Sequence, residues 1–82
     1  MKKFVVKILI DVDPELGAKL QPEEDRTVGH WLKDGIMQSM YYCTEGTELF
    51  AVMQAESEEK LHGHLKTLAF YPYMALKVWA VK

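Results

Sequence analysis

Segments with strand-like and helix-like residue patterns alternate along the chain in an order that permits few folds. Residues 3–12 are rich in β-branched and apolar side chains and contain no helix breaker, as expected of a strand. Residues 38–44 and 48–55 have the same character, and the turn-forming residues 45–47 between them predict a hairpin. Residues 76–81 form the last predicted strand.

Two segments with helical spacing lie between these strands. We expect residues 13–17 to form a loop, and Pro22 to occupy the first turn of the first helix, where its missing N–H costs nothing. Gly35 is the expected end of that helix. Ser57 is a typical N-cap for the second helix. The apolar stripe of the second helix consists of Leu61, Leu65 and Leu68.

The element order is therefore strand, helix, strand, strand, helix, strand (βαββαβ). This order is typical of the ferredoxin-like α+β fold, in which a four-stranded antiparallel sheet carries both helices on one face. A chain of 82 residues is too short for two separate cores. We therefore expect residues 1–82 to form a single domain.

The apolar content is high for so small a body, since 49% of the residues are hydrophobic. If water covered the sheet face opposite the helices, each strand would alternate apolar and polar residues, but the predicted strands are largely apolar on both faces. We expect this free face to carry Val5, Leu9, Leu49, Ala51, Met53, Trp79 and Val81. Because monomers rarely expose such a patch, we predict a homodimer formed by packing two free faces together.

Charge and hydropathy exclude several classes of protein. The net charge is −2 and the basic residues are spread along the chain, which does not fit a nucleic-acid-binding protein. No apolar stretch approaches the ~20 residues that span a bilayer, and no signal-peptide pattern is present. The single Cys43 cannot form an internal disulfide. We expect a cytoplasmic protein that binds neither nucleic acid nor membrane.

The sequence contains no pattern typical of a metal or cofactor site. His62 and His64 are two residues apart on a predicted helix, so they point to different sides and cannot share one ion. The five glycines form no phosphate-binding loop. We expect neither a metal nor a cofactor.

Glu24 is the candidate catalytic residue. It precedes Val28 by four residues and Trp31 by seven, which places it on the apolar side of the first predicted helix. Burial there would raise the pKa of the carboxyl and the helix N-terminus would lower it, a balance that suits a general base. The alternative is that Glu24 only complements the helix dipole and reaches solvent.

Aromatic side chains favour a binding site for a small organic ligand. Hydroxyl groups on apolar walls are a common lining of such sites. The group consists of Tyr41, Tyr42, Phe70, Tyr71, Tyr73 and Trp79. Lys7 and Asp11 share the free face of the first strand with Leu9, and each is either a pocket residue or a rim residue, where an unpaired charge costs less.

Two parts of the chain resemble one known family. The sequence Phe-Tyr-Pro-Tyr-Met at residues 70–74, between a leucine-striped helix and a terminal strand, is similar to the C-terminal signature of the muconolactone isomerase family. Ile-Asp-Val at residues 10–12, the Pro-containing loop after it, and Glu23 with Glu24 resemble the N-terminal half of that family. The resemblance implies a ferredoxin-like fold that pairs through its sheets as a dimeric α+β barrel, assembles into closed homo-oligomers, and uses no metal or organic cofactor.

The resemblance also implies an activity and a set of site residues. The isomerases move a double bond within an unsaturated lactone, during aromatic degradation, by abstracting and redelivering a proton. Glu24 matches an acidic pocket position of the family, Tyr73 its Pro-Tyr aromatic, and Asp11 its acidic residue on the first strand. We expect Tyr41 and Tyr73 to orient the substrate.

The chain departs from the family pattern where the isomerases bind the substrate's carboxylate. Leu9 and residues 38–42 stand in place of arginine and histidine, for which Lys7 can substitute only in part, as a point charge. We therefore expect an isomerase-like protein that moves a proton or double bond in a small, lactone-like, neutral or weakly polar compound. The alternatives are a cofactor-free monooxygenase of the dimeric α+β barrel group and a non-catalytic module that dimerises or binds a ligand.

Overall fold

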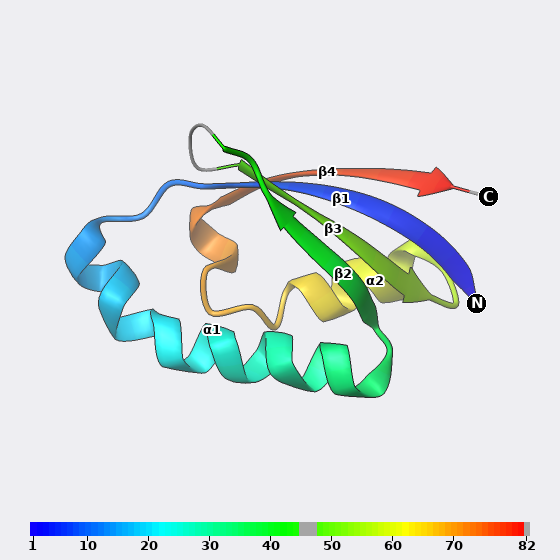
Figure 1. Cartoon of the computed structure of the whole chain (residues 1–82), viewed down its shortest axis with the longest axis horizontal. Coiled ribbons are helices and arrows are strands. Elements are labelled where there is room, and N and C mark those ends of the chain that lie inside the picture. Colours follow the sequence, from blue (N-terminus) through cyan, green and yellow to red (C-terminus); the bar gives the residue numbers. More distant parts are fainter. Residues whose placement is uncertain (45–47, 82) are drawn as a thin grey trace.

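Four antiparallel strands form one sheet, and both helices lie against the same face of it (Figure 1). The computed structural model describes residues 1–44 and 48–81, so the turn predicted at residues 45–47 lies outside the described residues. The elements in chain order are β1 (Lys2–Ile10), α1 (Pro14–Asp34), β2 (Met37–Tyr42), β3 (Glu48–Ala55), α2 (Glu58–Leu65), the 3-10 helix η1 (Tyr71–Tyr73) and β4 (Met74–Val81). The strand order β2-β3-β1-β4 confirms the predicted ferredoxin-like arrangement.

The central strand β1 separates the two faces of the sheet clearly. Phe4, Val6 and Ile8 are buried against the helices, on what we call the inner face. Val5 and Lys7 alternate with them and point to the opposite, outer face. β1 pairs with β3 on one side and β4 on the other, so its register determines which residues of both strands face the helices.

Strand β3 is apolar on both faces, and its orientation is the reverse of the one predicted. Three of its residues, expected on the outer face, are buried on the inner face: Leu49, Ala51 and Met53. Phe50 and Val52 instead lie opposite Lys7 and Val5 of β1 and face outward. Residues 49–53 are all apolar, so the sequence alone does not indicate which of them face inward. The pairing of β3 with β1 decides this. The outer face therefore carries Val5, Leu9, Phe50, Val52, Trp79 and Val81.

Strand β2 contains a bulge that changes which of its residues face inward. Met37 pairs with Met53 and Ser39 pairs with Val52, so Gln38 is an extra residue between them. After the bulge, Met40 and Tyr42 lie opposite inner-face residues of β3, and Tyr41 lies opposite the outward Phe50. One inserted residue thus brings Met37, Met40 and Tyr42 to the same face.

Helix α1 begins at Pro14, and the loop predicted over residues 13–17 is wrong. The first helical hydrogen bond runs from the Gly17 amide to the Asp13 carbonyl, 2.8 Å away. Pro14 fits the first turn of the helix because its missing N–H costs nothing there, which is the reason that Pro22 was expected in that position. A Cβ on Gly17 would lie 3.3 Å from Cγ1 of Val12, so this glycine allows a close approach rather than a turn.

Pro22 lies inside α1 instead of starting it. The first turns of α1 run at a different angle from the rest (Figure 1), as expected where proline removes a hydrogen bond from the helix. Gly35 ends the helix with a left-handed φ of 80°, as predicted. Its carbonyl accepts a hydrogen bond of 3.0 Å from Nε2 of Gln54, which ties the end of α1 to β3.

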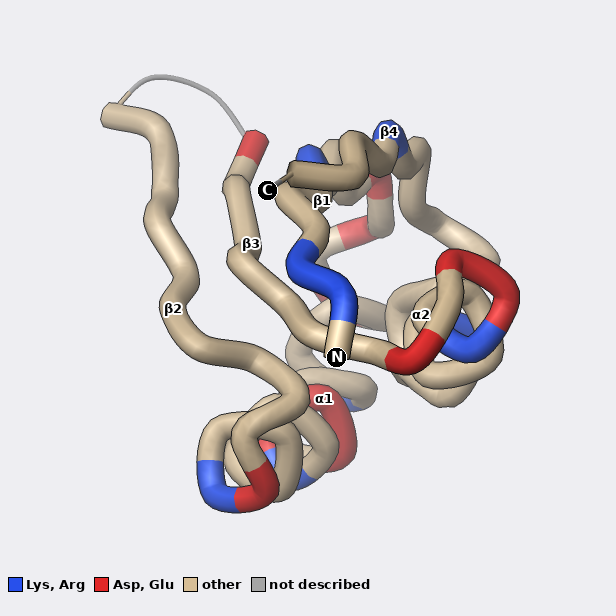
Figure 2. The backbone as a smooth tube through the Cα atoms, turned by 90° about the vertical axis from the view of Figure 1, so that its right-hand side faces the viewer, with Lys and Arg blue, Asp and Glu red and all other residues tan. Residues whose placement is uncertain are grey.

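Helix α2 completes the core on the inner face. The Ser57 hydroxyl accepts a hydrogen bond of 3.1 Å from the Lys60 amide, which confirms the predicted N-cap. The predicted stripe of Leu61, Leu65 and Leu68 is buried. In the end-on view, α1 and α2 lie side by side on the same side of the twisted sheet (Figure 2). Within the described ranges, no helix combines the length and the apolarity that crossing a membrane requires.

Candidate functional site

A cavity of about 300 Å³ lies between α1 and the inner face of the sheet. Helix α1 and strand β2 supply most of its wall, and the segment after α2 contributes Leu68 and Phe70. The lining is mainly apolar and consists of Ile8, Ile10, Gln21, Glu24, Asp25, Val28, Gly29, Trp31, Leu32, Met37, Met40, Tyr42, Leu49, Leu68, Phe70 and Met74. This volume is at the lower end of the range for small-molecule sites, so it suits a single small ring.

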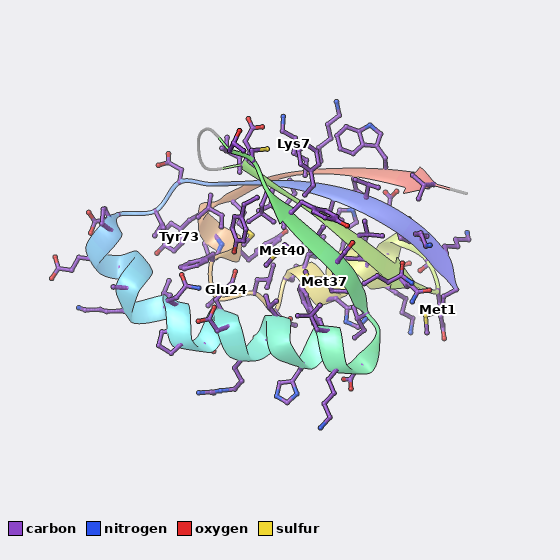
Figure 3. All side chains as sticks on the ribbon, viewed as in Figure 1. Met1, Lys7, Glu24, Met37, Met40 and Tyr73 are labelled. Carbon is purple, nitrogen blue, oxygen red and sulfur yellow. The ribbon has the colours of Figure 1, made fainter. Side chains whose placement is uncertain are left out.

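Glu24 is the polar group at the centre of this site. Its side chain points from α1 toward the sheet, in the same space as Met37 and Met40 (Figure 3). The residue is 7% exposed, and in the described part of the chain it is the one charged residue that is buried. The backbone N–H of Phe70 donates a hydrogen bond of 3.4 Å to its Oε1. The carboxyl is thus held by the segment that joins α2 to β4.

Burial raises the pKa of the Glu24 carboxyl above its ordinary value. Hydrogen bonds from the backbone N–H groups of Phe70 and Ala69 lower the pKa, and the nearby charges of Asp25 and Glu23 raise it, with a net increase. A carboxylate with a raised pKa is a stronger base. It can therefore take a proton from a weakly acidic carbon and also return one.

Two of the predicted substrate-binding residues, Lys7 and Tyr41, lie on the outer face of the sheet, away from the cavity. Lys7 stands on the side opposite the helices (Figure 3), and its Nζ is 3.5 Å from Oε2 of Glu48. Tyr41 is 64% exposed and lies beside Phe50 of β3. Neither side chain lines the cavity that contains Glu24.

The other two, Asp11 and Tyr73, lie close to each other at the end of the sheet. The Asp11 amide donates a hydrogen bond of 2.8 Å to the Tyr73 carbonyl. Both residues are exposed and border a separate, open depression together with Pro72. The structure therefore brings Asp11 and Tyr73 together, but not with Glu24.

Sequence reasoning did not select three polar residues that line the cavity. Tyr42 was one of six aromatic candidates, and only the bulge in β2 distinguishes it from Tyr41. Gln21 and Asp25 lie one helical turn apart on α1 and close to Glu24. This spacing is the feature of the sequence that could have indicated them. Because α1 was expected to begin at Pro22, Gln21 fell outside the predicted helix.

In the part of the chain that the structure describes, the histidines and acidic residues form no metal site. Within residues 1–44 and 48–81, no three of the residues His, Cys, Asp and Glu are placed to hold an ion together. His62 lies 3.8 Å from Glu58 on the surface of α2. The polar groups of the cavity lining are the carboxyls of Glu24 and Asp25, the amide of Gln21, the indole N–H of Trp31 and the hydroxyl of Tyr42.

The fold and the cavity define a ferredoxin-like α+β protein with a buried carboxyl in a ligand-sized pocket. The family model described as muconolactone delta-isomerase matches residues 1–82, and the chain belongs to this family. A muconolactone delta-isomerase from Pseudomonas aeruginosa is 25% identical over 76 residues, which cover 93% of this chain and 79% of that protein. A crystal structure of muconolactone isomerase superposes with a TM-score of 0.83 at 24% identity, covering 96% of this chain and 86% of the other.

Proposed function

We propose that the protein is an isomerase that needs no cofactor and moves a double bond in a small lactone-like compound, with Glu24 as the general base. The observation that carries the proposal is the position of the Glu24 carboxyl, which is buried in the wall of the cavity and has a raised pKa. Membership of the muconolactone delta-isomerase family supports the same chemistry.

The proposed reaction is a proton transfer between two carbons of one ring. The Glu24 carboxylate takes a proton from a carbon made acidic by the lactone carbonyl, and the electron pair of the broken C–H bond enters a dienolate. The protonated carboxyl then returns a proton to a different carbon, and the double bond forms at its new position. Glu24 is regenerated, so the reaction needs no oxidant or reductant.

The lining of the cavity supplies the other requirements of this step. The mainly apolar walls bury the Glu24 carboxyl and leave it short of solvation. Tyr42 is 70% exposed but is the one hydroxyl-bearing residue among the described residues of the lining, so it is the donor that we assign to the lactone carbonyl. The proposal places the substrate contacts on cavity residues, and not on Lys7, Asp11, Tyr41 or Tyr73.

Solvent-proton exchange tests the role of Glu24 directly. The protein is mixed with an unsaturated γ-lactone in deuterated water, and deuterium incorporation into the ring is followed by NMR. We expect Glu24→Gln to slow incorporation by at least about 100-fold, because a general base typically contributes that much or more. Glu15→Gln removes an exposed carboxyl from the same helix and is the matched control. Unchanged exchange in Glu24→Gln would remove this residue from the mechanism.

The same preparation separates the two alternatives. A cofactor-free monooxygenase consumes oxygen with a phenolic substrate, which an oxygen electrode measures. A non-catalytic module binds a ligand without exchange or oxygen uptake. Exchange that depends on Glu24, without oxygen uptake, is the result that the isomerase proposal requires.

We also propose that two copies pair through the outer face of the sheet. This face exposes Leu9, Trp79 and Val81, which are 38%, 40% and 39% exposed, together with the less exposed Val5 and Val52. An exposed apolar patch of this kind on a small protein marks an interaction surface, and a second copy presents the same surface. Light scattering that finds a monomer at micromolar concentration would contradict the pairing.

A further inference from the structure

The charged residues that line the cavity are all acidic. Glu24 and Asp25 contribute carboxyl groups, and none of the described residues of the lining is Lys, Arg or His. Among the described residues of the lining, the neutral hydrogen-bonding side chains are Gln21, Trp31 and Tyr42. Among the described residues of the lining, a ligand therefore finds donors for a carbonyl oxygen, but no positive charge for a carboxylate.

Asp25 is held at the edge of this cavity by a neighbour on the same helix. Nε2 of Gln21 donates a hydrogen bond of 2.7 Å to Oδ1 of Asp25, one turn further along α1. The bond fixes the direction of an otherwise exposed side chain. The bond also uses one N–H of the Gln21 amide, which is then not available to a ligand.

The pKa of Glu24 reflects the negative charges beside the cavity. The charges of Asp25 and Glu23 make a negative charge on Glu24 less stable, in the same direction as its burial. A ligand carboxylate beside Glu24 would meet the same negative field and the same apolar walls. Moving such a carboxylate out of water without a partner is costly.

We propose that Asp25, held in place by Gln21, is a specificity-determining residue that restricts the cavity to uncharged cyclic ligands. The inference rests on the proposed function for the lactone-like character of the ligand. It adds that the accepted lactone carries no free carboxylate. A cavity of about 300 Å³ leaves room for one ring with a short neutral substituent.

A pair of ligands that differ only in charge tests this proposal. The first is an unsaturated γ-lactone with a carboxymethyl substituent, and the second is the methyl ester of the same compound. Trp31 lines the cavity, so ligand binding changes its fluorescence. The chain contains two tryptophans, and Trp79 lies on the outer face, so titrations in a Trp79→Phe background report on the cavity alone.

We expect the ester to bind at least about tenfold more tightly than the acid, because the acid must bring a further negative charge beside the carboxyl groups of Glu24 and Asp25. Asp25→Asn keeps a hydrogen-bonding partner for Gln21 and removes the charge. It should tighten binding of the acid by roughly fivefold, a size expected for one solvent-exposed charge, and leave the ester within about twofold. Asp34→Asn removes a charge from the far end of α1, outside the cavity lining, and should change neither ligand.

Each outcome decides the proposal. Equal binding of acid and ester by the wild type would overturn it, as would failure of both ligands to bind. A preference for the ester that Asp25→Asn leaves unchanged would also overturn it, because the discrimination would then come from another residue. Binding is measured without turnover, so a protein that prefers the ester but shows no deuterium exchange would contradict only the proposed isomerase activity.

Discussion

The two faces of the sheet are built from the same strands but are completed in different ways. On the inner face, β1 and β3 bury Phe4, Val6 and Met53 against helices of the same chain. On the outer face, the neighbouring residues Val5 and Val52 are only half-buried, and no helix of the described residues covers them. The difference shows that alternation in these strands separates a core from a second surface that is itself partly apolar.

The surroundings of charged side chains also differ between the two faces. The inner face has Glu24 opposite it, buried in apolar surroundings, where a charge is costly and the carboxyl becomes more basic. The outer face has Lys7 paired with Glu48, and Nζ of Lys77 lies 5.0 Å from the centre of the Trp79 ring. Reactive chemistry is therefore expected on the inner side and association on the outer side.

The largest effect is expected from a charge placed in the middle of the outer face. Val52→Lys should weaken association of the two copies by at least about 100-fold, because an unpaired lysine would be buried between the sheets. Sedimentation or light scattering over a concentration series measures the shift. His30→Lys, on the exposed side of α1, is the control and should leave the mass unchanged. A Val52→Lys protein that remains dimeric would show that the outer faces do not meet.

A matched pair of valines on β1 compares the two faces at one position along the strand. Val6→Ala removes two buried methyl groups from the core and should lower the free energy of unfolding by about 2–3 kcal/mol. This cost should not depend on protein concentration. Val5→Ala should cost less than about 1 kcal/mol in dilute solution, and more as copies associate. Urea denaturation at several concentrations measures both, and an equal, concentration-independent cost would abolish the distinction between the faces.

The smallest effect is a pH dependence of stability that comes from the buried carboxyl. A folded-state pKa of Glu24 above the ordinary 4.5 means that the folded protein binds this proton more tightly than the unfolded chain does. The resulting stability is fully present below pH 4.5 and is lost as the pH rises through the folded-state pKa. Glu24→Gln lacks this loss, so its stability relative to the wild type should rise across that range, by about 1.4 kcal/mol per unit of pKa difference.

Denaturation at a series of pH values measures this difference, with Glu15→Gln as the control. A flat difference between the wild type and Glu24→Gln would show that the carboxyl is as well solvated as in the unfolded chain. A difference that falls with increasing pH would mean that its pKa is lowered instead. Either result would weaken the contrast in charge between the two faces.

The sequence predicts the fold well because local signals and chain order agree. Ser57 and Gly35 end helices through hydrogen bonds and backbone geometry that depend on only a few residues. Pro14 and Pro22 show the limit of such signals, since both fit the first turn of a helix and only packing decides between them. Gly17 lies in a helix for a packing reason that its sequence neighbours do not reveal.

The site is predicted less completely, because it depends on pairing between distant segments. Glu24 was found from its helical spacing to Val28 and Trp31, which is a local property. The faces of β3, and the choice between Tyr41 and Tyr42, depend on register, which sequence alternation cannot set in strands that are apolar on both sides.

The extra residue in β2 has a consequence for how this site can vary among proteins of similar fold. With Gln38 present, every later position of β2 is shifted by one relative to β3. If Gln38 were paired with Val52 instead of forming the bulge, Tyr41 would face inward and Tyr42 outward without a change in either residue, whereas deletion of Gln38 would leave both tyrosines facing as they do. A bulge gained or lost at constant strand length is therefore a route by which evolution can exchange the side chains presented to a ligand, and an alignment that ignores the bulge would compare the wrong tyrosines.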